Sequence, residues 1–135
     1  METVVKIDGK EMKLKTSAAL PRLYRLLLGR EIFVDMHNMT SIFSRVAAAA
    51  ADKKKEAPTQ QEQLEALTML ENITFVMNKH GDPSQPNTVE AWLEQFGEED
   101  ALANAGVLGT VVSLWNHETE TTAEEKKKKD KSTGE

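Results

Sequence analysis

The sequence predicts a mainly α-helical domain with a small N-terminal β-hairpin, an α+β fold of about five helices. Residues 5–14 alternate apolar and polar side chains on either side of Asp8-Gly9, which is the pattern of a hairpin. Most of residues 17–116 instead repeats apolar side chains every three or four positions, which is the pattern of amphipathic helices. These two patterns together define the fold class.

The chain divides into one folded domain and a polar end. Its length suits a single domain, which we place at residues 1–117, with an internal polar linker at 52–61. The segment 118–135 contains Ala123 as its only hydrophobic residue, so we expect a disordered charged tail. Six acidic residues against five lysines give this tail a charge of -1, so most of the net charge of -5 belongs to the domain.

The hairpin turn is predicted at Asp8-Gly9, which favours a two-residue turn with both residues at positive φ. Such a turn pairs Val5 with Met12 on an apolar face, and Lys6 with Glu11 on a polar face. Because an isolated hairpin is marginal in water, we expect its apolar face to pack on the helices.

Two helices are expected after the hairpin. For the first, Ser17 is the predicted N-cap and Gly29 the predicted stop. Its apolar face contains Leu20, Leu23, Tyr24, Leu27 and Leu28. For the second, Asp35 is the predicted cap. Its apolar stripe contains Met36, Met39, Phe43, Val46, Ala47 and Ala50.

A third helix should begin at the capping box formed by Thr59 and Glu62 and end near Gly81. It has two apolar sides. One contains Ala66, Met69, Leu70, Ile73, Val76 and Met77, and the other contains Leu64, Leu67 and Phe75. A helix that is apolar on two sides is either sandwiched within its domain or offers one side to a partner. We take the side with Leu64, Leu67 and Phe75 as the candidate partner-binding groove.

The last part of the domain predicts a short helix capped by Thr88 and stopped by Gly97, then a helix over about 98–116. Gly106 and Gly109 lie on a small-residue face of this last helix, which predicts close approach of another backbone. Trp92 and Trp115 are each either core anchors or interface hot spots, and both remain candidate partner-binding residues.

The chemical inventory favours a binding protein over an enzyme. The absence of cysteine excludes disulfides, thiolate metal sites and thiol nucleophiles. His37, His80 and His117 lack the spacing of metal ligands, and we expect His80 to interact with the dipole at a helix end. No serine lies in a nucleophile motif. We expect no catalytic residue, no metal and no cofactor.

Charge and hydropathy exclude further classes. A net charge of -5 opposes nucleic-acid binding, and the basic runs Lys53–Lys55 and Lys126–Lys129 have acidic neighbours, which favours solvated segments. The start of the chain lacks a signal-peptide pattern, and no stretch approaches the roughly 20 apolar residues of a membrane span. We therefore expect a soluble intracellular protein.

Four segments of the chain resemble a known family, the tail assembly chaperones of long-tailed bacteriophages and of prophages in Gram-positive bacteria. The segments are Lys6–Ile32, Leu67–Pro83, Thr88–Gly97 and Ser113–Asp130. The resemblance rests on their order and spacing, since no single motif is chemically diagnostic. The chain departs from the family around Ala101–Gly109, where small residues replace bulkier apolar ones.

The resemblance implies a non-catalytic protein of the bacterial host cytoplasm. Such chaperones bind the tape measure protein, keep it soluble, help to recruit the major tail protein and are absent from the mature virion. The resemblance also allows a homo-oligomer and a longer frameshifted form of the chain. Lys126–Lys129 fit an adenine-rich slippage site, which the DNA sequence would test.

Two alternatives remain at this stage. One is a minor structural tail or connector protein that is retained in the virion. The other is a regulatory adaptor protein encoded by a prophage. Each would share the helical fold and the sparse chemistry, so neither is separated from a chaperone by the sequence.

Overall fold

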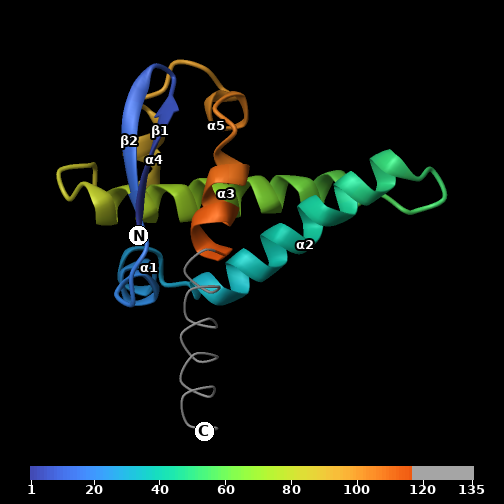
Figure 1. The fold of residues 1–135 in the computed structure, drawn as a ribbon, viewed down its shortest axis with the longest axis horizontal. Helices are drawn as coiled ribbons and strands as arrows, with labels where there is room; N and C mark the ends of the chain where they lie inside the picture. The colour runs from blue at the N-terminus through green and yellow to red at the C-terminus, as the bar shows by residue number, and fades with distance from the viewer. Residues whose placement is uncertain (117–135) are drawn as a thin grey trace, which may run out of the picture.

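Helix α3 (Gln60–Gly81) passes through the middle of the fold, and the other elements are arranged around it (Figure 1). The computed structural model describes residues 1–116. The order of elements is β1 (Glu2–Ile7), β2 (Lys10–Lys15), α1 (Leu20–Leu28), α2 (Ile32–Ala51), α3, α4 (Val89–Leu93) and α5 (Ala101–Asn104), and residues 107–116 are also helical. The expected α+β class is therefore confirmed. The expected tail at 118–135 and His117 lie outside the described residues.

The hairpin has the predicted register. Val5 pairs with Met12 and Lys6 with Glu11 in an antiparallel sheet of β1 and β2. Asp8 and Gly9 have φ values of 52° and 76°, the left-handed conformation that such a turn needs. The apolar face of the hairpin is buried: Val5, Ile7, Met12 and Leu14 belong to the core. The helical layer therefore supplies the support that a lone hairpin lacks.

The start of α1 differs from the prediction. Gly29 ends the helix with a φ of 67°, as expected, but Ser17 is not the N-cap. The N-cap is Ala19, and the Ser17 hydroxyl instead accepts a hydrogen bond from the Ala19 N–H at 3.1 Å. Leu20 and Tyr24 are buried, and Leu23, Leu27 and Leu28 pack against the core.

The expected cap of α2 is also wrong, because Asp35 lies inside the helix and serves another purpose. Its carboxylate is 1% exposed and accepts two hydrogen bonds from the Arg30 guanidinium and one from the Tyr24 hydroxyl, all at 2.7 Å. Burial acts to raise the pKa of Asp35, but the hydrogen bonds from Arg30 and Tyr24 outweigh burial and lower it. Asp35 therefore joins α1, the following turn and α2.

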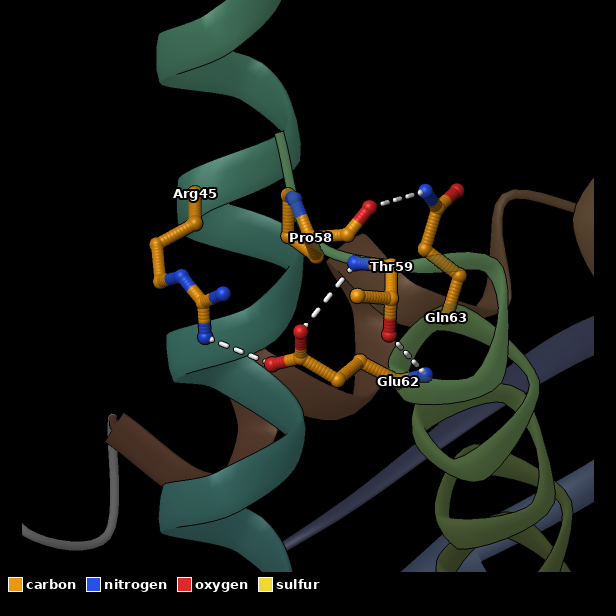
Figure 2. Close-up of polar contacts among 5 residues, drawn as sticks. All are labelled: Arg45, Pro58, Thr59, Glu62 and Gln63. Carbon is orange, nitrogen blue, oxygen red and sulfur yellow. Dashed lines mark hydrogen bonds and ion pairs between the residues drawn. The ribbon is translucent and has the colours of Figure 1, made fainter. Parts of the chain in front are cut away.

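The connection between α2 and α3 contains the predicted capping box (Figure 2). The Glu62 N–H donates to Thr59 Oγ1, and the Thr59 N–H donates to Glu62 Oε1, each at 3.1 Å. Glu62 also pairs with Arg45 of α2 at 2.9 Å, so one carboxylate caps α3 and links the two helices. Gln60 and Gln61 already belong to α3, so the expected linker is shorter at its C-terminal end.

The end of α3 contacts the hairpin directly. Asn78 is fully buried, and its side-chain amide donates to the Lys13 carbonyl oxygen at 3.0 Å while accepting from the Trp92 indole at 2.8 Å. A Cβ added at Gly81 would overlap the Lys13 carbonyl oxygen and lie 3.0 Å from its carbon. The close backbone approach of this fold is therefore at Gly81.

The last helical segment is interrupted, contrary to the expectation of one helix over about 98–116. Gly106 has a φ of 64°, which separates α5 from the helix of residues 107–116. Within residues 1–116, no heavy atom lies within 4 Å of a Cβ added at Gly109, so no other described segment makes the close approach predicted at this stripe. Likewise, α4 is capped by Thr88 as expected but ends at Leu93 rather than at Gly97.

Candidate partner-binding surface

The five candidate partner-binding residues do not form one surface, because some are exposed and others are buried. Leu64 and Leu67 are exposed on α3, at 53% and 40%. Phe75 and Trp92 are fully buried, and Trp115 is half-buried on the helix of residues 107–116. The candidate groove with Leu64, Leu67 and Phe75 on one side of α3 is therefore not formed, because its third member lies in the core.

Phe75 and Trp92 are anchors of the core. Their ring centroids lie 5.9 Å apart, and Trp92 also packs edge-to-face on Phe96 at 5.1 Å. The Trp92 indole N–H donates to Asn78, so its polar group is satisfied inside the protein. Trp92 was predicted to be either a core anchor or an interface hot spot, and the structure shows it as a core anchor.

The two halves of α3 have different surroundings. Residues 73–78 are all buried, because the hairpin, α1 and α4 pack around this half of the helix. In the first half, α2 contacts the helix but Leu64 and Leu67 stay exposed. The helix is thus sandwiched within the domain in its second half, while its first half leaves Leu64 and Leu67 exposed.

Leu64 lines a groove of about 460 Å³ at the start of α3. Its other lining residues are Arg30, Gln61, Glu65, Thr68, Met69 and Asn72. Apart from Leu64 and Met69, this lining is polar, with one positive and one negative side chain. The groove is therefore mixed in character and nearly neutral.

Leu67 lines a second groove, of about 300 Å³, between α3 and the segment from Leu93 to Ala103. Its apolar members include Leu93, Phe96 and Leu102, and its acidic members are Glu71, Glu98, Glu99 and Asp100. Burial raises the pKa of Glu71. We call this the α3–α5 groove.

The hairpin turn fixes one wall of the α3–α5 groove. Asp8 accepts a hydrogen bond from the Gly97 N–H at 2.9 Å, and Lys10 donates to the Gln95 carbonyl oxygen at 2.6 Å. Both contacts hold the segment that follows α4, which carries Phe96 into the groove lining. The wall is thus attached to a β-turn from the other end of the sequence.

A third apolar surface was not foreseen from the sequence. Phe33 at the start of α2 is 59% exposed, and its ring packs edge-to-face on Trp115 with centroids 5.4 Å apart. These two residues line a groove of about 320 Å³ with Met36, His37, Thr40, Val112 and Asn116. The run Ile32-Phe33-Val34 was the available signal, since three successive residues of a helix cannot all face the core.

The histidines show one polar contact that the sequence did not indicate. His80 Nε2 and Ser17 Oγ lie 2.7 Å apart and share a hydrogen bond, which ties the segment before α1 to the last turn of α3. Burial, Lys15 and the N-terminal amine lower the pKa of His80, while Glu2 acts in the opposite direction. His80 lies in the last turn of α3, as expected, and the contact with Ser17 adds to that placement.

Residues 1–116 contain no group of three or more His, Asp or Glu side chains arranged to hold a metal ion. In the same range, no helix combines the length and apolar character that crossing a bilayer requires.

Comparison with known proteins finds no matching family model, no matching curated protein and no matching solved structure.

Proposed function

We propose that this chain is a non-catalytic tail assembly chaperone of a long-tailed bacteriophage or prophage. It binds the tape measure protein in the host cytoplasm, keeps it soluble and helps to recruit the major tail protein. The observation that carries the proposal is the exposed pair Leu64 and Leu67 on α3, each lining a separate groove beside the same helix.

The exposed leucines suit a protein that holds a helical partner. Grooves lined by apolar side chains bind amphipathic helices, which insert their apolar residues at helical spacing. Leu64 and Leu67 are three residues apart, so they project from neighbouring positions of one helix surface. The capping box and the Arg45–Glu62 pair stabilise this end of α3, which supports a preformed surface.

The resemblance of the four sequence segments supplies the identity of the partner. Three of them lie wholly within the described residues and contribute the hairpin with α1, the second half of α3, and α4. These are the elements that pack around the buried half of α3. The resemblance therefore covers the scaffold that leaves the first half of α3 open.

Co-expression with the tape measure protein encoded beside this chain tests the proposal. The chain is expected to raise the soluble fraction of the tape measure protein and to co-purify with it. The double variant Leu64→Asp/Leu67→Asp should lose this effect, because charged side chains cannot occupy an apolar contact without desolvation. Leu26→Asp is the matched control, since Leu26 is 74% exposed on α1 and lines neither groove.

Two results would overturn the proposal. One is an unchanged soluble fraction of the tape measure protein in the presence of the chain, with no complex after purification. The other is detection of the chain as a stoichiometric component of purified phage particles, since an assembly chaperone leaves before the tail is complete.

A further inference from the structure

We infer that the α3–α5 groove docks an amphipathic helix whose apolar stripe is flanked by lysine or arginine residues. The inference rests on the proposed function, because it states which chemistry of the tape measure protein this surface would recognise. It is carried by the combination of an apolar floor with charges of one sign around it.

The floor of the groove comes from three separate elements. Leu67 of α3, Leu93 of α4 and Phe96 contribute large apolar side chains, and Ala101 and Leu102 of α5 add to them. Leu67 is 40% exposed here, although the preceding residue Ala66 is fully buried. A partner that covers it gains the free energy of removing apolar surface from water.

The negative charge of the groove favours a partner with positively charged side chains. Glu71, Glu98, Glu99 and Asp100 line it, and among the described residues 1–116 no lysine, arginine or histidine does. Asn104 donates to Glu98 and Asp100 at 3.2 and 3.1 Å, but an amide leaves their negative charge in place. Within residues 1–116, none of the ion pairs includes these four residues.

The half-buried position of Glu71 also favours a positively charged partner. Burial raises the pKa of its carboxyl, because the ionised form loses hydration without gaining a cation. A lysine or arginine on the edge of a docked helix would supply that cation. The groove beside Leu64 lacks this feature, since Arg30 and Glu65 balance one another there.

The lining favours a helix over an extended peptide. The groove is formed by side chains of α3, α4, α5 and their connections, and no strand contributes to it. An extended peptide would therefore find no strand edge with which to form a hydrogen-bonded ladder, whereas a helix binds through its side chains alone.

Labelled peptides of about 20 residues, long enough to form helices, test the inference by fluorescence anisotropy with the full chain. One peptide carries a leucine stripe flanked by lysines, the second replaces each lysine with glutamate, and the third keeps the lysines but replaces each leucine with serine. The lysine–leucine peptide should bind, and its affinity should fall as salt is raised, because exposed charge pairs are screened. Equal binding of the glutamate or serine peptide would overturn the inference.

Variants of the chain test whether the lysine–leucine peptide binds in the α3–α5 groove. Neutralising three lining residues with Glu98→Gln, Glu99→Gln and Asp100→Asn should weaken binding of the lysine–leucine peptide by about 10-fold, as expected for three partly exposed ion pairs. A control with the same charge change, at the exposed residues Glu11, Glu56 and Glu90 outside the groove, should bind like the wild type. Equal weakening by both triple variants would overturn the inference, because long-range charge alone would then explain binding.

The same variants separate this inference from the proposed function. If the neutralised triple variant solubilises the tape measure protein as well as the wild type does, the groove assignment fails while the chaperone function stands. If the lysine–leucine peptide binds in the groove but the tape measure protein is not solubilised, the chaperone function fails while the groove assignment stands.

Discussion

The contact between Gly81 and the hairpin gives the most direct test of how the fold is held together. Replacing Gly81 with alanine places a methyl group on the Lys13 carbonyl oxygen, with the carbonyl carbon at 3.0 Å and the Lys13 Cγ at 3.1 Å. Lys13 cannot easily retreat, because it pairs with Val4 in the sheet and its carbonyl oxygen accepts a hydrogen bond from Asn78. The clash must therefore move β2 away from α3.

Two effects of Gly81→Ala lower the free energy of unfolding, and one raises it. Inserting a methyl group into a closely packed site costs about 1–3 kcal/mol. Weakening the Asn78 hydrogen bond adds about 0.5–1.5 kcal/mol. The better helix propensity of alanine returns at most about 1 kcal/mol. We expect Gly81→Ala to lower the free energy of unfolding by about 2 kcal/mol, or the Tm by roughly 8 °C.

Gly109→Ala is the matched control, since it makes the same change in a helix where nothing lies within 4 Å of the new methyl group. It should raise the free energy of unfolding by up to about 1 kcal/mol. Urea and thermal unfolding followed by circular dichroism measure both variants. A Gly81→Ala variant as stable as the wild type, or a Gly109→Ala variant that is the more destabilised of the two, would show that the Lys13 contact does not limit the packing of α3 on β2.

Three further predictions concern polar contacts. Asp35→Asn should lower the free energy of unfolding at pH 7 by about 2 kcal/mol, because it removes the carboxylate that pairs with Arg30 and accepts from the buried Tyr24 hydroxyl. The folded pKa of Asp35 lies below its unfolded value of 3.8, so the wild type should lose this stability as the pH falls below about 4. Urea titrations at several pH values measure this loss. Equal acid sensitivity of the wild type and Asp35→Asn would contradict the role given to Asp35. The folded pKa of His80 also lies below its unfolded value of 6.5, so the wild type should lose stability as the pH falls from 6.5 through the folded pKa. His80→Gln should therefore show a shallower slope between pH 7 and 5, and an unchanged slope would count against the contact. Asn78→Ala should cost about 2–4 kcal/mol, because the buried Trp92 indole N–H and Lys13 carbonyl oxygen both lose their partner, and a near-wild-type Tm would disprove this role.

The parts of the fold that follow from local chemistry were predictable from the sequence. Asp8-Gly9 sets the hairpin register because few residues adopt positive φ at two successive positions. Thr59 with Glu62 marks the start of α3 because their side chains satisfy backbone N–H groups near the helix end. Gly29 ends α1 for the same conformational reason that governs the hairpin turn.

The parts that depend on packing between distant segments were not predictable. Periodicity placed Phe75 beside Leu64 and Leu67, but it could not show that Trp92 covers Phe75 while Leu67 stays exposed. Asp35 has the sequence signature of a cap, yet it lies beside Arg30 and Tyr24 and is instead the buried member of an ion pair with a half-exposed arginine. Such outcomes require the positions of the neighbouring elements, which single-helix patterns do not contain.

The candidate surface was likewise predictable only where it depends on a single helix. Leu64 and Leu67 were identified because a helix with two apolar sides needs a second contact. The acidic lining of the α3–α5 groove was missed, since Glu98, Glu99 and Asp100 fall at the start of the helix expected over about 98–116, where acidic residues are favourable without any partner. Only the approach of this segment to α3 shows that these charges line one groove together with Leu67, Leu93 and Phe96.

Leucine-methyl NMR of the chain, recorded alone and bound to the tape measure protein, would locate the partner on the surface of the chain. We expect the methyl signals of Leu67 and Leu93 to shift or broaden, followed by those of Leu64, while the signals of Leu26 stay unchanged. A complex in which only Leu26 responds, or in which no leucine responds, would contradict the claim that the open half of α3 holds the partner.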